Sequence, residues 1–297
     1  MNNKVKAHLA LIGGNLIYGL NYVVAKGIMP DYISPKGVIF WRVLIAFIFF
    51  NVYNLFWGKE KVDKKDLLRL AVCALFGVAI NQIMFFEGLN LSTPINASIL
   101  MTSTPIITTI FAFFLIKERP NLLKIVGIIM GTSGATAIIL MGGNFSLSSD
   151  LFVGNLFLFL NAVSFAFYLV IAKPLLVKYK TMTVIRWVFN FGIIFALPFC
   201  IKPALEVNYQ LFDFRVWASM FYILFAVTIL AYLLVSSSLR HVSPIVTSSY
   251  IYTQPFIASV VSVFIMHEKL TLIEIISALL IFSGVYFVSR QKRKALA

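Results

Sequence analysis

Long apolar stretches run through the chain and limit what it can fold into. A helix that crosses a bilayer needs roughly 20 mostly apolar residues, because each residue adds about 1.5 Å and the hydrocarbon core is about 30 Å thick. The qualifying stretches lie at about residues 7–26, 35–57, 67–89, 94–116, 121–141, 151–172, 182–201, 215–238, 244–266 and 270–289. The connections between them are short. The sequence therefore predicts an all-α polytopic membrane protein with ten transmembrane helices.

Charge is scarce and unevenly distributed. The chain is 60% hydrophobic and 12% charged, whereas soluble domains are about half apolar and about a quarter charged. The net charge of +14 does not require a nucleic acid partner, because most Lys and Arg fall in alternate connections. The positive-inside rule explains this bias and predicts an inner (plasma) membrane protein with both termini cytoplasmic.

The sequence also repeats itself. A shift of 150 residues brings matching residues into register without a gap: Pro94 with Pro244, Pro105 with Pro255, Glu118 with Glu268, and Gly134 with Gly284. Weaker matches pair Lys26 with Lys173 and Arg42 with Arg186. We therefore predict two related units, residues 1–145 and residues 146–297.

Each predicted unit holds an odd number of helices, so the second enters the membrane inverted relative to the first. Two inverted five-helix repeats are typical of secondary transporters, in which similar halves rock about a site near the middle of the bilayer. The repeat gives such a chain two conformations of similar energy, each open to one side. This is the strongest functional indication in the sequence.

Two prolines mark the expected substrate pathway. Pro105 and Pro255 fall near the middle of predicted helices, where proline removes a backbone donor from Met101 and Ile251. A carbonyl left without its donor persists in a membrane only where protein or a water-filled cavity satisfies it. We interpret the pair as breaks beside a hydrated site. The alternative is a kink satisfied by neighbouring Ser and Thr side chains.

Polar residues recur at helical spacing within several apolar stretches. Such side chains are costly toward lipid and should face inward. The predicted pathway comprises Asn15, Tyr18, Asn21, Tyr22, Met101, Thr104, Pro105, Asn161, Ser164, Tyr168, Tyr250, Gln254 and Pro255. For each polar member, a hydrogen bond between helices is an equally good interpretation.

Ionisable residues inside the spans are candidate charge sites. Glu87 could bind protons or a cationic group of the substrate, or it could cap its helix at the interface. Arg42 and Arg186 could each hold a carboxylate or extend to the interface with the stem in the apolar region. Neither the two cysteines nor the three histidines have the spacing of metal ligands, so we expect no metal and no cofactor.

The chain resembles a known family over essentially its whole length. The run Leu-Ser-Thr-Pro-Ile-Asn-Ala-Ser at 91–98, Lys-Glu-Arg at 117–119, and their counterparts Val-Ser-Pro at 242–244 and His-Glu-Lys at 267–269 resemble the EamA branch of the drug/metabolite transporter superfamily. The resemblance implies a basket-like helical transporter that works by alternating access and often exports amino acids. One departure is Glu87, where many members have a small uncharged residue.

Other function classes fit less well. An intramembrane enzyme would need a catalytic constellation, and no Gly-x-Ser-x-Gly or His-Glu-x-x-His is present. A channel would need a carbonyl filter or a charged ring. We therefore predict no enzyme but a secondary transporter that exports an amino acid or similar amphipathic metabolite. Its partners would be this small molecule, the lipid bilayer and a candidate coupling proton, in a monomer or homodimer.

Overall fold

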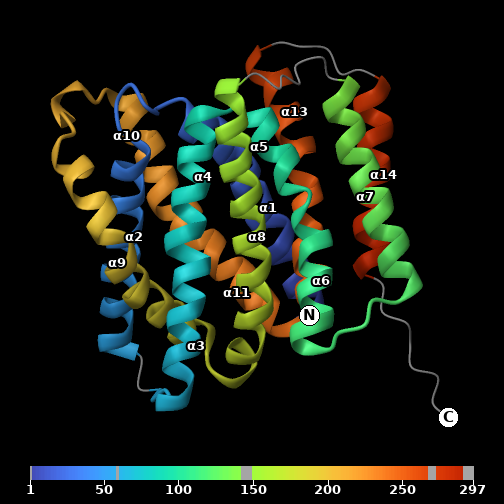
Figure 1. Ribbon diagram of the computed structural model, residues 1–297, viewed down its shortest axis with the longest axis horizontal. Coiled ribbons are helices and arrows are strands. Elements are labelled where there is room, and N and C mark those ends of the chain that lie inside the picture. Colours follow the sequence, from blue (N-terminus) through green and yellow to red (C-terminus); the bar gives the residue numbers. More distant parts are fainter. Residues whose placement is uncertain (1, 58–59, 142–148, 267–271, 290–297) are drawn as a thin grey trace.

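The computed structural model describes residues 2–57, 60–141, 149–266 and 272–289, which form helices without any β-strand (Figure 1). The first half contains α1 (Asn3–Lys26), α2 (Pro35–Trp57), α3 (Lys64–Ala74), the π-helical segment η1 (Leu75–Ala79), α4 (Ile80–Leu91), α5 (Pro94–Met101), α6 (Thr104–Ile116) and α7 (Leu122–Met141). The predicted boundary between the two units, residues 145 and 146, lies outside the described residues.

The second half follows a similar order. It contains α8 (Ser149–Lys178), α9 (Thr181–Leu205), the 3-10 turn η2 (Tyr209–Leu211), α10 (Phe214–Phe221), the π-helical segment η3 (Tyr222–Ala231), α11 (Tyr232–His241), α12 (Pro244–Ser249), the 3-10 turn η4 (Tyr250–Tyr252), α13 (Thr253–Met266) and α14 (Leu272–Ser289). Both halves thus carry a π-helical segment in the third predicted span and an interruption in the fourth.

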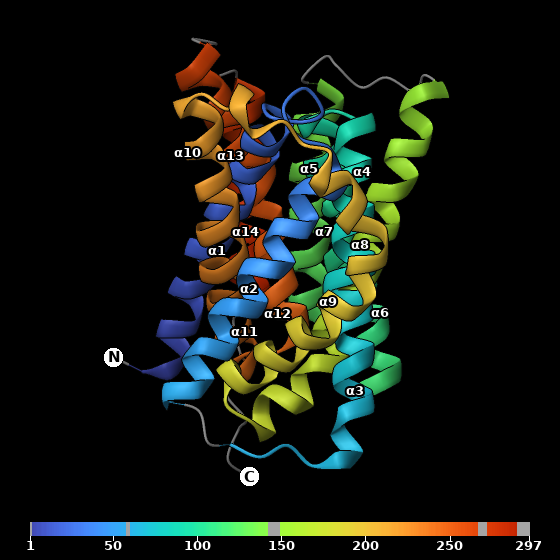
Figure 2. The same cartoon turned by 90° about the vertical axis from the view of Figure 1, so that its left-hand side faces the viewer.

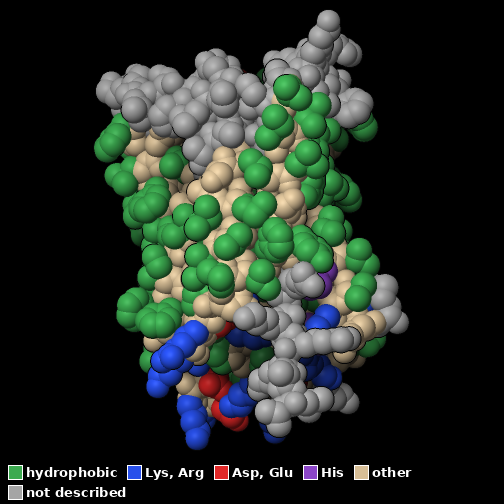
Figure 3. Space-filling model, turned by 90° about the vertical axis from the view of Figure 1, so that its right-hand side faces the viewer, with side chains coloured by type: hydrophobic (Ala, Val, Ile, Leu, Met, Phe, Trp, Pro, Cys, Tyr) green, Lys and Arg blue, Asp and Glu red, His purple; other side chains and the backbone are tan. Residues whose placement is uncertain are grey.

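The helices are suited to a bilayer. In the described part of the chain, 6 helical stretches are long and apolar enough to cross a membrane, and further apolar helices are shorter. Figure 3 shows a broad band of hydrophobic side chains on one face, with Lys and Arg gathered beyond one end of the band. The membrane fold is confirmed, while the count of ten crossings stays a prediction because several spans are short or broken.

Helix packing repeats between the halves. The helix α4 packs on α8 as α1 packs on α11, and α6 packs on α8 as α1 packs on α13. The helices α3, α4, α5 and α6 all pack on α8, and we name these five group A. The helix α1 packs on α11, on α13 and on η3, which continues α10, and we name α1, α10, α11 and α13 group B. The pairs α2–α9 and α7–α14 each join the halves at the edges of the bundle (Figures 1 and 2).

A lysine anchors the first helix of each half to the end of the third span. The Lys26 Nζ donates to the backbone oxygens of Leu89 (3.2 Å) and Asn90 (2.7 Å) near the end of α4. The Lys173 Nζ donates to the oxygens of Leu239 (2.7 Å) and Arg240 (3.1 Å) near the end of α11. Lysine suits this place because the last carbonyls of a helix lack intrahelical donors.

Small residues bring α7 and α14 together. A Cβ added at Gly127 would lie 2.6 Å from the Gly284 backbone oxygen, so the two backbones touch directly. A Cβ at Gly131 would enter the ring of Tyr252. These glycines therefore allow α7 to pack closely on α14 and on Tyr252 within one chain.

Candidate functional site

A cavity lies at the centre of the bundle, between groups A and B. Its volume of about 70 Å³ is room for roughly two water molecules, since each takes about 30 Å³ in the liquid. The lining combines six aromatic rings, five carboxamides, three apolar side chains and one cation: Tyr18, Tyr22, Phe85, Phe86, Phe165, Tyr232, Asn21, Asn81, Gln82, Asn161, Gln254, Met101, Val227, Ile251 and Arg42. A mostly apolar wall with a few polar groups is the usual form of a small-molecule site.

Breaks in two helices shape one side of the cavity. The chain turns at residues 102 and 103 between α5 and α6, where Ser103 Oγ donates to the Leu100 oxygen at 2.6 Å. Pro105 stands in the first turn of α6, a position that tolerates proline because the first amides of a helix have no intrahelical acceptor. The prediction of a break is confirmed, and the helix restarts at the proline.

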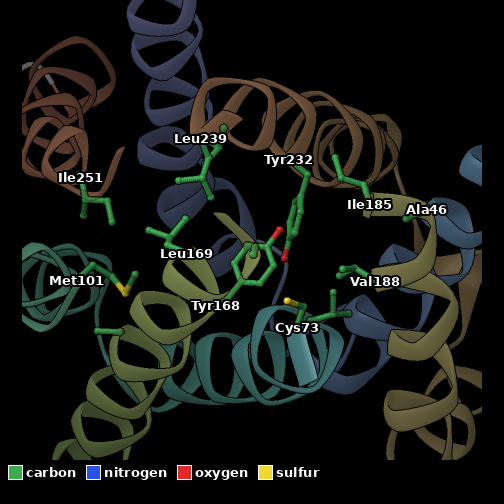
Figure 4. Packing of buried hydrophobic residues seen from close by; sticks show 14 of the residues in the cluster. Ala46, Cys73, Met101, Tyr168, Leu169, Ile185, Val188, Tyr232, Leu239 and Ile251 are labelled. Atoms are coloured by element: carbon green, nitrogen blue, oxygen red, sulfur yellow. The ribbon is translucent and has the colours of Figure 1, made fainter. Parts of the chain in front are cut away.

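The second half has the equivalent break. The 3-10 turn η4 separates α12 from α13, and Thr253 Oγ1 donates to the Tyr250 oxygen at 2.7 Å. Met101 and Ile251, which the shift of 150 residues equates, both line the cavity. Figure 4 shows their side chains extending into the same region from helices of different halves. Pro105 and Pro255 are buried nearby and do not line the cavity.

The two π-helical segments face the same region. A π-helical turn leaves backbone carbonyls without the usual donor four residues later, and buried carbonyls need partners. Tyr232 Oη donates to the Gly77 oxygen at 2.8 Å, and Ser164 Oγ donates to the Phe76 oxygen, both in η1. Thr228 Oγ1 donates to the Ile223 oxygen at 2.8 Å within η3. The apolar periodicity of the sequence does not indicate either π-helical segment.

A chain of side-chain hydrogen bonds crosses from the first half to the second at the cavity edge. Tyr22 Oη donates to Gln254 Oε1 at 2.6 Å, and Gln254 Nε2 donates to Asn15 Oδ1 at 2.8 Å. Asn15 Nδ2 completes the chain by donating to the Leu11 oxygen at 2.9 Å. The structure thus brings together three residues that the sequence predicted for the pathway.

Arg42 provides the charge in the cavity lining. Its side chain is only 4% exposed, its Nε donates to Thr228 Oγ1 at 2.8 Å, and its guanidinium carbon lies 4.8 Å from the centre of the Phe86 ring. Arg42 therefore does not extend to an interface. Arg186 differs, because it is partly exposed and lies 5.3 Å from the centre of the Trp187 ring.

The remaining predicted residues divide by location. Asn21, Tyr18 and Asn161 line the cavity together with Tyr22, Met101, Gln254 and Arg42. The others lie outside the lining: Thr104 and Tyr168 are buried, Ser164 binds the Phe76 carbonyl, and Tyr250 Oη is 2.7 Å from His8 Nδ1. In Figure 4 the Tyr168 ring lies beside Tyr232. Sequence reasoning missed Asn81 and Gln82, whose signal was a polar pair inside an apolar span.

Glu87 lies apart from this lining. Its Oε1 is 3.6 Å from Lys36 Nζ, and the pair joins the end of α4 to the start of α2. The Glu87 side chain is 23% exposed. The structure therefore gives Glu87 a basic partner at an end of the bundle.

A second set of ion pairs lies at the opposite end. Lys178 Nζ contacts Asp63 Oδ2 and Asp66 Oδ2, each at 2.6 Å. The hydrogen bond from Lys178 holds the pKa of the Asp63 carboxyl below its usual value. These contacts tie the beginning of α3 to the end of α8 within group A. Among the described residues, no group of three His, Cys, Asp or Glu side chains is arranged to hold a metal ion.

Comparison of the sequence with known protein families also shows the repeat. The sequence profile of the EamA-like transporter family aligns twice, with residues 5–140 and with residues 152–290. The chain belongs to the EamA-like transporter family. The two aligned segments correspond to the two halves described above.

Relatives of this EamA-family protein share its full length. An "uncharacterized transporter" of Archaeoglobus fulgidus is 24% identical over 97% of this chain and 99% of its own. The "uncharacterized inner membrane transporter YicL" of Salmonella typhimurium is 24% identical over 99% of this chain and 98% of its own. A crystal structure with 17% identity superposes with a TM-score of 0.73 over 95% of both chains, which shows a shared fold.

Proposed function

We propose that this EamA-family protein is a secondary carrier of the inner membrane that exports a small amphipathic metabolite by alternating access. The observation that carries the proposal is the central cavity between groups A and B, with one helix break from each half beside it. Because the halves are related, the same contacts can form on either side of the bilayer in turn. Both termini would then lie in the cytoplasm.

The lining of the cavity supports a small amphipathic substrate. Rings such as Tyr22 and Phe85, whose centres are 5.5 Å apart, offer apolar surface, and carboxamides offer hydrogen bonds. Asn21 Oδ1 and Asn161 Oδ1 are buried and have no hydrogen-bond partner among the described residues. Since buried acceptors without partners are unfavourable, a bound molecule or water would satisfy them.

Counterflow in liposomes tests the proposal. Purified protein would be reconstituted in vesicles preloaded with one compound of a panel of amino acids and carboxylic acids, and uptake of its labelled form would be followed. A carrier gives saturable exchange, whereas a channel gives no counterflow and an enzyme gives chemical turnover. Absence of exchange for every compound by folded protein would contradict the proposal.

A matched pair of variants locates the pathway. Gln254→Ala removes an amide that bonds Tyr22 and Asn15 at the cavity. Asn51→Ala removes an amide that bonds Asn190 Oδ1 at 2.6 Å between α2 and α9, away from the cavity. We expect the first variant to lose exchange at least about tenfold, the size of one or two lost hydrogen bonds, and the second to retain it.

Proton antiport is the energy source that we propose for export, with Glu87 as the candidate carrier of the proton. The Glu87 carboxylate lies 3.6 Å from Lys36 Nζ, and this ion pair would be lost when Glu87 gains a proton. In Glu87→Gln, uphill transport should fall and its pH profile should flatten. Full uphill transport with an unchanged profile would remove Glu87 from the proposal.

A further inference from the structure

We infer that the central cavity selects an organic monoanion, with the carboxylate bound by Arg42 and an apolar body held between the aromatic rings. The inference names the substrate class of the proposed carrier and rests on that function for its transport part. It begins from the Arg42 side chain. A guanidinium that is 4% exposed is costly to bury unless its charge is balanced and its donors are used.

The donors of Arg42 are used only in part. Its one hydrogen bond among the described residues runs from Nε to Thr228 Oγ1 at 2.8 Å, and Phe86 covers one face of the guanidinium at 4.8 Å. The terminal nitrogens remain without a hydrogen-bond partner in the described part of the chain. Two parallel N–H groups match the two oxygens of a carboxylate.

Among the described residues, no acid balances this charge within the lining, since none of the lining side chains is Asp or Glu. The acidic side chains that form ion pairs in the described residues do so elsewhere: Glu87 with Lys36, Glu118 with Lys124, and Asp63 and Asp66 with Lys178. The lining therefore has a net positive charge. Electrostatic complementarity favours a ligand of net charge minus one over a cation, a neutral molecule or a zwitterion.

The other residues of the lining indicate what kind of ligand body would fit beside the carboxylate. Tyr18, Phe85 and Phe165 provide apolar walls, and Met101 and Ile251 meet at the broken helices. The Oδ1 atoms of Asn21 and Asn161 would accept a hydrogen bond from a hydroxyl of the ligand. An ammonium group could use the same oxygens, so an amino acid is the comparison that decides between a monoanion and a zwitterion.

A series with one carbon skeleton tests the charge preference directly on the wild-type protein. The matched probes are 3-phenylpropionate (anion), phenylalanine (zwitterion), 3-phenylpropylamine (cation) and 3-phenylpropanamide (neutral), and 4-methylvalerate is added as a smaller carboxylate. Binding would be measured by thermal shift and by calorimetry in nanodiscs. We expect at least one carboxylate to bind about tenfold or more tightly than the amide and amine, as charge-assisted hydrogen bonds imply.

Several results would overturn the inference. Tighter binding of phenylalanine than of 3-phenylpropionate would show a zwitterion site. Equal affinity for 3-phenylpropanamide and 3-phenylpropionate would show that the site does not discriminate by charge. Failure of both carboxylates to bind wild-type protein would also overturn it. None of these outcomes requires a variant, so a misfolded mutant cannot obscure them.

Variants then assign the preference to one residue. Arg42→Gln should abolish the advantage of the carboxylate over the amide, and Arg42→Lys should retain part of it because a lysine keeps the charge without the fork. Arg186→Gln is the control, since Arg186 is the residue that the predicted repeat matches with Arg42 and it lies outside the cavity lining. An unchanged carboxylate preference in folded Arg42→Gln would assign the site elsewhere.

The binding series and the counterflow assay fail independently. If a carboxylate binds through Arg42 but no compound exchanges, the inference stands and the carrier function fails. If exchange occurs only for amino acids and for no carboxylic acid of the panel, the carrier function stands and the inference fails.

Discussion

At the scale of single residues, glycines decide how closely rings can approach the backbone. Gly77 belongs to η1, and a Cβ at this position would enter the ring of Tyr168. Its carbonyl oxygen accepts from Tyr232 Oη at 2.8 Å. Gly77 thus lets the Tyr168 ring lie against η1 and holds Tyr232, which lines the cavity.

Gly77→Ala should therefore destabilise the protein. Overpacking a closely packed site costs about 1–3 kcal/mol because rings and backbone must shift. Thermal unfolding in detergent would measure the loss. Gly13→Ala is the control, since its Cβ would lie 3.6 Å from the Leu234 side chain in ordinary contact and alanine favours helix. Equal stability of the two variants would show that the Tyr168 contact does not constrain η1.

At the scale of helices, each half uses a lysine to fasten its first helix to the end of its third span. Lys26 holds α4 and Lys173 holds α11, each through at least two backbone oxygens. Lys173 also donates to the Val242 oxygen at 2.9 Å, where the chain leaves α11 for α12. The lysine thus connects α8 of group A with α11 of group B.

Lys173→Met should weaken this connection while keeping the apolar stem. Hydrogen bonds to a charged group contribute about 1.5–3 kcal/mol, so a loss of at least about 1.5 kcal/mol is expected. Hydrogen exchange at the end of α11 should increase as well. Lys202→Met, at an exposed site in α9, should leave both unchanged. Unaltered hydrogen exchange at the end of α11 in Lys173→Met would mean that the stability of this helix end does not depend on the lysine.

At the scale of the whole molecule, packing separates the cavity walls into group A and group B, which meet around the cavity. The helices α2 with α9 and α7 with α14 flank them on opposite sides (Figure 1). The alternating-access account requires the two groups to rotate relative to each other. One end of the bundle should close as the other opens.

Part of this architecture could be predicted from the sequence, and part depends on contacts that form only in the folded protein. Apolar length and the paired prolines predict the spans and the breaks, because both depend on local chain chemistry. The π-helical segments could not be predicted, since they depend on donors such as Tyr232 from elsewhere in the fold. Hydropathy places Ser164 and Asn21 alike inside the bundle, and only packing decides that one bonds a carbonyl and the other faces the cavity.

Distances between spin labels at both ends of the molecule test the central claim most directly. One pair would join Lys6 in α1 to Lys65 in α3, and the other would join Leu91 in α4 to Phe214 in α10; all four residues are exposed, and the buried Cys73 and Cys200 would be replaced. Each pair links group A with group B, at opposite ends. With and without a transported ligand, the account predicts that one distance lengthens as the other shortens. Distances that stay unchanged at both ends in protein that exchanges its substrate would contradict it.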